Sequence, residues 1–325
     1  MAEQYDAIIL GAGPAGLTAA IYLGRNRLKP LVVDTGTAGG QMVLSHLVAN
    51  YPGVETTSGR EISQTMLRQA RSFGAEVITQ ATVTRLDLTG DTKVVAIDDE
   101  GEFEAPVVIV ATGGTPRTLG LESEQRFKGL GISYCATCDG DFFTDKEIIV
   151  VGGGNSALEE AVSLTRYASK ITVVHVLDDF QAQPWALDEA KQNPKIELLN
   201  PYGVVRFEGE EHLEQVVIEH QHSGERRTIS AEGTFIFIGY LPNTGWLEGQ
   251  ITLNDRGEII ADEDMRTNLA GVFVAGDTRV KRYRQITTAV ADGTIAALSA
   301  SDYLQNRQRH DAPAVSQAKP ASHAA

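Results

Sequence analysis

The sequence predicts an α/β fold made of two Rossmann-like domains, with the second domain inserted into the first. Three observations predict it. The chain has 325 residues, more than one ordinary hydrophobic core organises. A strand, glycine-rich turn and helix occur twice, and apolar segments 107–110 and 234–238, each leading into glycine and proline, flank the second copy. We therefore expect an outer domain of residues 1–115 and 244–325 and an inserted domain of residues 116–243.

Composition excludes several classes of protein. A hydrophobic content of 42% and 32 glycines fit a globular chain with many tight turns. The net charge of −15 argues against nucleic acid or an anionic membrane as partner. No secretory leader or run of about 18 apolar residues is present, so we expect a cytoplasmic protein. With two cysteines and no histidine near them, no metal site is expected.

The first glycine turn predicts a dinucleotide site. Strand Ala7–Leu10 leads into the run Gly11-Ala12-Gly13-Pro14-Ala15-Gly16, then a helix over about 17–26 and a strand over 31–33 ending at Asp34. In this motif the first glycine permits the tight turn, the second lets the backbone approach a pyrophosphate, and the third lets helix and strand pack closely. Asp34 is placed to accept hydrogen bonds from a ribose.

The second glycine turn predicts a weaker nucleotide site. A strand over 148–151 leads into Gly152-Gly153-Gly154-Asn155-Ser156-Ala157, a helix to about residue 167 and a strand over 171–174. The segment expected to hold a ribose or its 2′-phosphate, residues 175–181, reads HVLDDFQ and contains no Arg or Lys. A 2′-phosphate needs a guanidinium partner, and the two aspartates would repel it. We therefore treat the site as vestigial or weak, formed by Gly152, Gly154, Asn155 and Ser156.

The cysteine pair predicts redox chemistry. Cys135 and Cys138 are separated by Ala136 and Thr137 and followed by Asp139, on the inserted domain just before its glycine turn. A two-residue spacer lets the two sulfurs close into a disulfide and lowers the pKa of one thiol, so the pair can cycle between dithiol and disulfide. The alternative is a pair of buried thiols that act as small hydrophobes.

A Gly-Asp pair near the C-terminus predicts a second cofactor contact. A strand over 271–275 ends in Gly276-Asp277, followed by a basic run and a helix over 286–303. A carboxylate there can bind the ribityl chain of a flavin, and the helix N-terminus would face it. The alternative is a solvated turn with a basic surface patch. Past Arg307 the composition predicts a disordered tail.

Together these motifs resemble the low-molecular-weight thioredoxin reductases from about residue 5 to residue 304. The resemblance implies an FAD on the outer domain, a homodimer, and an insert whose disulfide reduces thioredoxin or a similar protein. It implies that Cys138 is the sulfur nearest the flavin, that Cys135 attacks the substrate, and that Asp139 protonates a leaving thiolate. The FAD-binding residues it implies, with those already named, are Gly11, Gly13, Pro14, Ala15, Gly16, Asp34, Gly40, Gln41, Asn50, Val83, Thr112, Gly113, Gly276, Asp277, Arg284, Gln285 and Ile286.

One departure from the family concerns the electron donor. The members that use NADPH carry an HRRxxxR stretch, and all three arginines are absent at residues 175–181. The chain thus resembles the ferredoxin-dependent and deep-branching cyanobacterial reductases, so we do not expect NADPH as donor and expect NADH to bind weakly at most. A basic run of Arg279, Lys281, Arg282 and Arg284 suggests docking of an acidic carrier such as ferredoxin. The alternative is a set of solvent-facing charges with one residue, Arg284, that contacts the flavin.

The leading function is therefore reduction of thioredoxin through FAD and the cysteine pair, with ferredoxin or another donor in place of NADPH. One alternative is a dithiol oxidase that passes electrons from a small dithiol to oxygen. Others are an NAD(P)H-dependent thioredoxin reductase of altered nucleotide specificity and a non-catalytic redox sensor. In the leading mechanism the insert rotates about the connections near Gly113 and Gly239.

Overall fold

The computed structural model describes residues 2–45, 48–247 and 249–311. The chain divides into two compact units. The first unit comprises Met1–Met42, Ile62–Gly113 and Thr244–Ala325, and the second comprises Val43–Glu61 and Gly114–Asn243. Segment Val43–Glu61, which we expected in the outer domain, is grouped here with the second unit. The exact domain boundaries stay a prediction.

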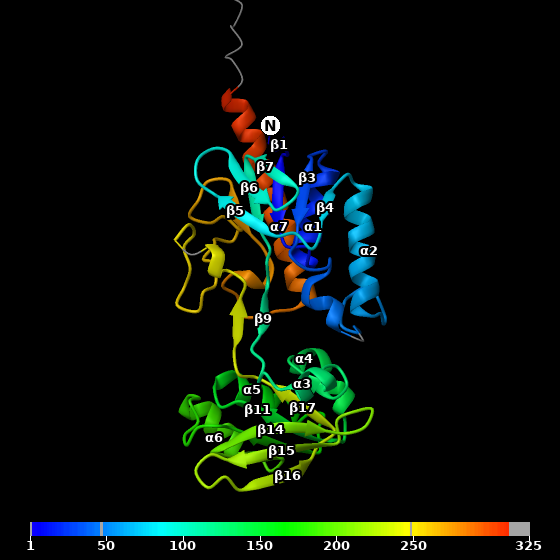
Figure 1. Ribbon diagram of the computed structural model, residues 1–325, viewed down its shortest axis with the longest axis vertical. Helices are drawn as coiled ribbons and strands as arrows, with labels where there is room; N and C mark the ends of the chain where they lie inside the picture. The colour runs from blue at the N-terminus through cyan, green and yellow to red at the C-terminus, as the bar shows by residue number, and fades with distance from the viewer. Residues whose placement is uncertain (1, 46–47, 248, 312–325) are drawn as a thin grey trace, which may run out of the picture. The chain divides into compact units, whose positions relative to one another are not determined.

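The first unit is a three-layer α/β structure (Figure 1). Its central sheet is parallel, in the order β19-β8-β2-β3-β4. Helices α1 and α7 pack against each other on one face of the sheet. A smaller sheet, in the order β1-β7-β6-β5, covers the other face. The elements of this unit are β1 (Glu3–Gln4), β2 (Ala7–Leu10), α1 (Pro14–Arg25), β3 (Pro30–Val33), β4 (Glu76–Ile78), β5 (Val83–Asp87), β6 (Lys93–Ile97), β7 (Gly101–Ala105), β8 (Val107–Val110), η3 (Gly245–Leu247), β19 (Val272–Val274), η4 (Gly276–Thr278) and α7 (Ile286–Asp311).

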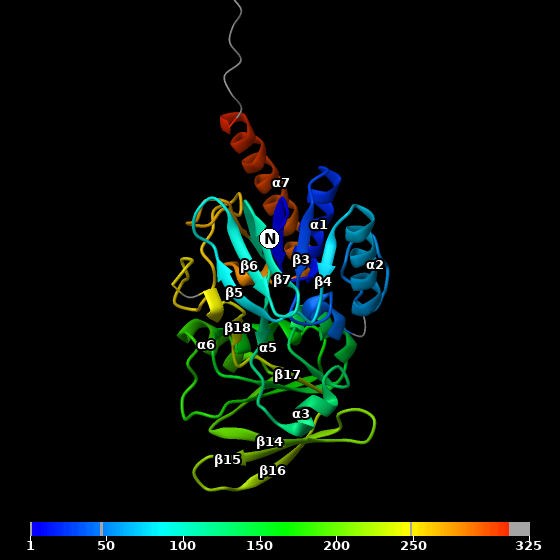
Figure 2. The same ribbon diagram turned by 45° about the horizontal axis from the view of Figure 1, so that its top comes forward.

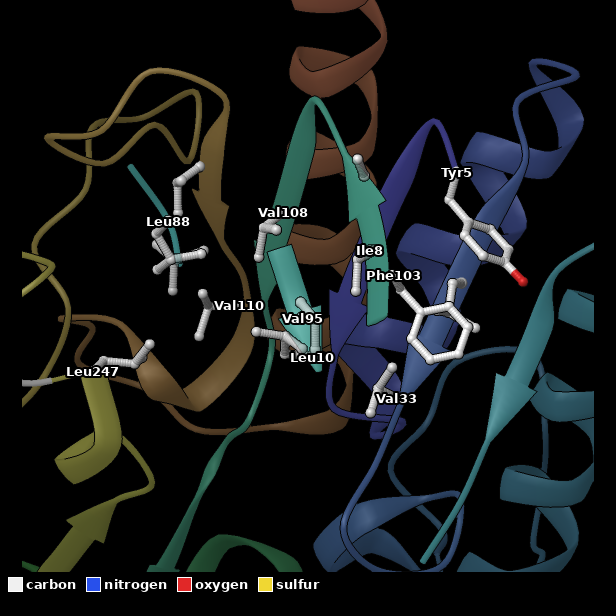
Figure 3. Close-up of a cluster of buried hydrophobic side chains, with 14 of the residues drawn as sticks. Tyr5, Ile8, Leu10, Val33, Leu88, Val95, Phe103, Val108, Val110 and Leu247 are labelled. Carbon is white, nitrogen blue, oxygen red and sulfur yellow. The ribbon is translucent and has the colours of Figure 1, made fainter. Parts of the chain in front are cut away.

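Alternation along the central strands builds the core of the first unit. Successive side chains of a strand point to opposite faces, so Ile8 and Leu10 of β2 face the smaller sheet while Ile9 faces the helices. Figure 3 shows Val108 and Val110 of β8 in the same cluster as Val95 and Phe103 of the smaller sheet. Strands buried on both faces are apolar throughout, which is why Ala7–Leu10 and Val107–Val110 contain no polar residue.

The second unit repeats this plan (Figure 2). Its parallel sheet runs β10-β17-β11-β12-β13, with α5 and α6 on one face and the antiparallel sheet β14-β15-β16 on the other. A short antiparallel pair, β9 with β18, joins the two connecting segments. The elements are β9 (Gly114–Pro116), α3 (Glu122–Phe127), β10 (Ile132–Ser133), α4 (Ala136–Asp139), η2 (Gly140–Phe143), β11 (Glu147–Val151), α5 (Asn155–Leu164), β12 (Lys170–Val174), α6 (Pro184–Gln192), β13 (Ile196–Leu199), β14 (Tyr202–Glu208), β15 (Gln215–His220), β16 (Arg226–Ser230), β17 (Gly233–Ile236) and β18 (Tyr240–Pro242).

Two helices cross the division into units. The short helix η1 (Gly40–Leu44) and helix α2 (Gly59–Ser72) each begin in one unit and end in the other. Helix α2 begins with a capping arrangement, in which the amide of Glu61 donates to Ser58 Oγ and the Glu61 carboxylate accepts from the amide of Ser58. This start was not predicted from the sequence.

The predicted α/β fold with two Rossmann-like units is confirmed, and the strands expected at 7–10 and 107–110 have the same bounds in the structure. Helix α7 begins at the predicted Ile286 but continues to Asp311, so the helix extends past Arg307, where we expected a disordered tail. The remainder of that tail, residues 312–325, lies outside the described residues. Within the described ranges no helix is both long enough and apolar enough to cross a membrane.

Candidate functional site

The cysteine pair closes into a disulfide at the start of a short helix. Cys135 precedes α4 and Cys138 lies within it, with Cα atoms 5.3 Å apart. The backbone amide of Cys138 donates a hydrogen bond to Cys135 Sγ over 3.2 Å. An amide aimed at a sulfur stabilises the thiolate form when the disulfide is opened. Cys135 is therefore in a position that favours an anionic nucleophile.

Asp139 is attached to this pair through a serine. Ser133, the last residue of β10, donates a hydrogen bond from Oγ to Asp139 Oδ2 over 2.6 Å and accepts one from the amide of Cys135 over 3.0 Å. Burial raises the pKa of Asp139, and the nearby Asp141 raises it further, while the bond from Ser133 lowers it. A carboxyl with a raised pKa can hold a proton for transfer.

A second buried carboxylate fixes the segment that carries the pair. Glu124 of α3 is fully buried and accepts hydrogen bonds from the amides of Leu119 and Gly120 and from the hydroxyl of Tyr134, the last over 2.7 Å. Tyr134 immediately precedes Cys135. Because three donors satisfy this carboxylate, it holds the chain ahead of the cysteines in one conformation.

The first glycine turn is packed so closely that side chains are excluded at several positions. Gly11 has a φ of +111°, and a Cβ there would strike the carbonyl group of Ala111. A Cβ on Gly16 would strike the carbonyl oxygen of Gly11. Gly13, at the N-cap of α1, has no neighbour within 4 Å of an added Cβ. The backbone at Gly13 is thus open at the N-terminus of a helix with no side-chain cap, a position whose free amides suit an anionic group such as a pyrophosphate.

Asp34 lies at the end of β3, as predicted, and is engaged by the backbone. Its carboxylate accepts hydrogen bonds from the backbone amide of Ala12 over 2.5 Å and from that of Gly36 over 2.7 Å. The amide of Gly39 donates to the carbonyl of Ala12 over 2.7 Å, which brings the segment before Gly40 against the glycine turn. Each carboxylate oxygen can accept a second hydrogen bond, so the ribose role of Asp34 stays a prediction.

The C-terminal Gly-Asp pair meets the same turn. A Cβ on Gly276 would lie 2.9 Å from the Cβ of Ala15, and a Cβ on Gly293 of α7 would strike the carbonyl of Ala15. Thr278, fully buried, accepts the amide of Gly113 at Oγ1 over 2.6 Å. The predicted residues from the start of α1, the end of β8 and η4 therefore converge within the first unit.

A buried cluster of charged residues packs beside η4 in the first unit. Asp292 of α7 accepts hydrogen bonds from the amide of Gly276, from Arg279 and from Lys281, the last over 2.8 Å. Arg284 pairs with Glu258. The basic run proposed as a docking site for an acidic carrier is thus largely neutralised inside the unit, and its exposed cation is Arg282. This weakens the docking hypothesis.

Asp277 provides a test of whether FAD fits. Its Oδ1 atom is buried and accepts no hydrogen bond, and the nearest cation, Lys281 Nζ, is 3.9 Å away. Burial raises the pKa of Asp277, although Lys281 and Arg284 oppose the shift. A buried acceptor without a donor is costly unless a ligand supplies one. A hydroxyl of FAD would donate a hydrogen bond to Asp277. Together with the open backbone at Gly13, Asp277 therefore fits the cofactor.

The remaining predicted residues are more scattered. Gln41 is exposed on η1, and Val83 begins β5 and packs against the core of the first unit. Gln285 precedes α7, which Ile286 begins, and its amide donates to Thr288 Oγ1. Asn50 is exposed and belongs to the second unit. None of the FAD roles assigned to these residues is tested by their positions.

The loop that follows β12 is hydrogen-bonded to the second glycine turn. The amides of Gln181 and Ala182 donate to the carbonyl of Gly153, and the amide of Gln183 donates to Asn155 Oδ1 over 2.7 Å. The ring of His175 lies where a Cβ on Gly153 would be. Val176 and Leu177, which stand where NADPH-dependent members carry arginines, are 48% and 52% exposed.

Sequence reasoning missed several residues of these sites. Ser133, Glu124, Thr278 and Asp292 are buried polar residues whose partners lie far along the chain or across a turn. One signal was available for Asp292, because Asp-Gly inside a long helix opposes helix propensity and indicates a special packing role. Among the described residues no group of three or more His, Cys, Asp or Glu could hold a metal ion.

Comparisons with known proteins agree on one family. The sequence profile of the pyridine nucleotide-disulphide oxidoreductases matches residues 5–293. The chain is 43% identical over 312 residues to a thioredoxin reductase of Peptoclostridium acidaminophilum, covering 94% of this chain and 98% of that protein. It is 41% identical over 312 residues to the thioredoxin reductase of Peptoclostridium litorale, with the same coverage. The crystal structure of thioredoxin reductase from Streptococcus pyogenes matches with a TM-score of 0.90 at 40% identity, covering 94% of this chain and all of that one.

Proposed function

The chain belongs to the low-molecular-weight thioredoxin reductases within the pyridine nucleotide-disulphide oxidoreductases, and on that premise we propose that it reduces the disulfide of a thioredoxin-type protein. Enzymes of this family are FAD-dependent oxidoreductases. The observation that carries the proposal is the Cys135–Cys138 disulfide, with an amide aimed at Cys135 Sγ and a carboxyl of raised pKa next to Cys138. Dithiol-disulfide exchange requires these groups: a redox-active cysteine pair, a donor that stabilises the thiolate and a carboxyl that can supply a proton.

FAD, when bound, supplies the electron pair that opens the disulfide. The backbone at Gly13 and the N-terminus of α1 would hold its pyrophosphate, and Asp277 would accept a hydroxyl of its ribityl chain. Asp34 would bind a ribose. The other FAD residues expected from the sequence, Gln41, Asn50 and Val83 among them, are part of this proposal on the strength of the resemblance.

The cysteines have different roles in the proposal. With FAD bound, Cys138 would be the sulfur that receives the electrons, and Cys135 attacks the substrate disulfide to form a mixed disulfide, which Cys138 then resolves. Asp139 provides the proton that a leaving sulfur takes. Positive φ values at Gly113 (+62°) and Gly239 (+119°) mark the two connections about which we propose that the insert turns.

We further propose that the electron donor is not NADPH but ferredoxin or another carrier. The support is the loop after β12, where residues 175–183 include no Arg or Lys and where Asp178 and Asp179 would repel a 2′-phosphate. The neutralised basic run of the first unit gives no support to electrostatic docking of ferredoxin there. NADH would bind weakly at most. A homodimer is part of the proposal through the family resemblance, and sedimentation of the purified protein tests it.

Anaerobic titration tests the donor. The bound flavin is mixed separately with NADPH, NADH and reduced ferredoxin, and its visible absorbance is followed. We expect bleaching by the carrier, slow or no bleaching by NADH, and none by NADPH at micromolar concentration. Rapid bleaching by NADPH would overturn the donor proposal.

A second experiment tests the reductase activity without any donor. The flavin is reduced by light, thioredoxin is added, and new thiols on thioredoxin are counted. We expect stoichiometric transfer. Rapid oxygen uptake with a small dithiol, without transfer to thioredoxin, would instead favour the dithiol oxidase.

A further inference from the structure

We propose that the hydroxyl of Ser133 is a positioning group that keeps a hydrogen bond to Asp139 in both protonation states of that carboxyl, by turning its own proton between two acceptors. The inference rests on the proposed function, because it concerns the proton that dithiol-disulfide exchange moves. The hydrogen bonds described for the Ser133 hydroxyl join it to Asp139 and to the backbone of Cys135, so it acts through those groups.

The geometry around Ser133 Oγ provides both arrangements. Asp139 Oδ2 lies 2.6 Å away, the amide of Cys135 donates to Oγ over 3.0 Å, and the carbonyl oxygen of Cys135 lies 3.4 Å away. A hydroxyl has one proton to donate and two lone pairs to accept with. With Asp139 ionised, the hydroxyl donates to Oδ2. With Asp139 protonated, Oδ2 donates to Oγ and the hydroxyl proton turns to the carbonyl of Cys135.

The proposed exchange needs both states within one turnover. The Cys135 thiolate attacks the substrate disulfide, so a bond forms between Cys135 and one substrate sulfur while the substrate S–S bond breaks, and the leaving sulfur takes the proton of Asp139. The Asp139 carboxylate then takes the proton of Cys138. The Cys138 thiolate attacks Cys135 Sγ, which restores the disulfide and releases the second substrate sulfur as a thiolate. Two electrons pass from the cysteine pair to the substrate, and Asp139 ends protonated as it began.

The environment makes such support necessary. Ser133 is 5% exposed, and a buried carboxyl that loses its hydrogen bond on changing charge pays the full desolvation cost. The charged group that acts on the pKa of Asp139 is Asp141 of η2. Helix α5, which packs against α4, carries Glu159 and Glu160, and α3 presents Glu124, which is satisfied by Tyr134 and two amides. Among the groups described as acting on the pKa of Asp139 there is no cation, so no cation takes over the role of the Ser133 hydroxyl.

Infrared difference spectroscopy tests the proposal without using thioredoxin or any donor. In the full-length FAD-loaded protein, the carbonyl band of protonated Asp139 is identified by its loss in Asp139→Asn and followed against pH. Because the bond from Ser133 lowers the pKa of Asp139, Ser133→Ala should move the midpoint of this band to higher pH, and Ser133→Thr, which keeps the hydroxyl, should restore it. An unchanged midpoint in Ser133→Ala overturns the proposal.

Single-turnover oxidation of the light-reduced protein by thioredoxin gives the second readout. We expect Ser133→Ala to slow the step about tenfold at neutral pH and to shift its pH profile to higher pH, as expected for a misplaced general acid. Ser133→Ala should add nothing in the Asp139→Asn background, because the hydroxyl acts through that carboxyl. A further loss in that background overturns the proposal.

Two comparisons separate the sources of failure. Ser299→Ala removes another buried hydroxyl, on α7 of the first unit, and should leave the midpoint and the rate unchanged. If wild-type protein fails to reduce thioredoxin while the infrared midpoint still shifts in Ser133→Ala, the proposed function is wrong and the coupling of Ser133 to Asp139 stands. If the transfer works and the midpoint does not shift, the proposed function stands and the coupling of Ser133 to Asp139 is wrong.

Discussion

The two glycine turns of this protein share a backbone plan and differ in what surrounds them. In the first unit, Gly13 is the open N-cap of α1, a carboxylate ends the second strand, and Asp277 brings a buried acceptor without a donor. In the second unit, Gly154 is an equally open N-cap of α5, but the loop after β12, which is hydrogen-bonded to the turn, contains no Arg or Lys. On the proposed assignment, the difference between the two turns lies in the charge and hydrogen bonds that the surrounding segments supply to a ligand, since the backbone of the two turns is alike.

The largest expected effect comes from the cysteine pair. Cys138→Ser removes the resolving thiol, so transfer of electrons from the flavin to thioredoxin should fall by at least about 10³-fold. Because the first unit is unchanged, the flavin spectrum and FAD content should stay as in the wild type. Transfer that survives this change would show that electrons reach thioredoxin by another route.

The next effect compares the two turns directly. Gly13→Ala and Gly154→Ala each add a methyl group at an extended N-cap with no protein atom within 4 Å, so each should cost the apoprotein no more than about 1 kcal/mol. If only the first turn holds a pyrophosphate, Gly13→Ala should weaken FAD binding about 100-fold, by removing close backbone approach, and Gly154→Ala should leave it unchanged. Fluorescence titration of the apoproteins with FAD measures both.

Adding charge to the second turn should make it resemble a working nucleotide site. Val176→Arg, Leu177→Arg and Gln181→Arg together place three guanidinium groups on exposed positions of the loop. We expect NADPH to bleach the flavin at least about tenfold faster than in the wild type, and the gain to fall with salt. The same three positions changed to Gln are the matched control. No gain in the arginine variant would mean that the missing arginines are not what limits the use of NADPH.

The smallest effect concerns stability against pH. The pKa of Asp139 is raised in the folded protein, so folding favours its protonated form, and the contribution of this group is lost as pH rises through the folded pKa. Asn keeps the acceptor for Ser133 without the charge. Relative to Asp139→Asn, the wild type should therefore lose stability as pH rises from the pKa of an unfolded aspartate, about 3.9, to the raised pKa of Asp139 in the folded protein. Urea unfolding of the two oxidised proteins at several pH values measures the difference between their stabilities. A wild type that gained stability relative to Asp139→Asn as pH rises would contradict the prediction.

The fold could be predicted because its signals are local. Alternating burial is absent from Ala7–Leu10 and Val107–Val110, whose uniformly apolar residues indicate strands covered on both faces. The predicted helix start at Ile286 agreed with the structure. The predicted end did not, because the composition after Arg307 does not by itself end a helix, and α7 continues to Asp311. The grouping of Val43–Glu61 with the second unit had no local signal, since it depends on contacts between segments far apart in the chain.

The candidate site divides in the same way. The sequence by itself determined the residue types and spacings that chemistry needs: the cysteines three apart, the acid after them, the glycines of both turns and the missing arginines. The tertiary structure decided which polar groups satisfy one another, such as Ser133 with Asp139 and Asp292 with Gly276 and Lys281. Spacing acts through the local backbone and is visible in the chain order, but the hydrogen bonds of a buried group depend on distance in space, which only folding sets.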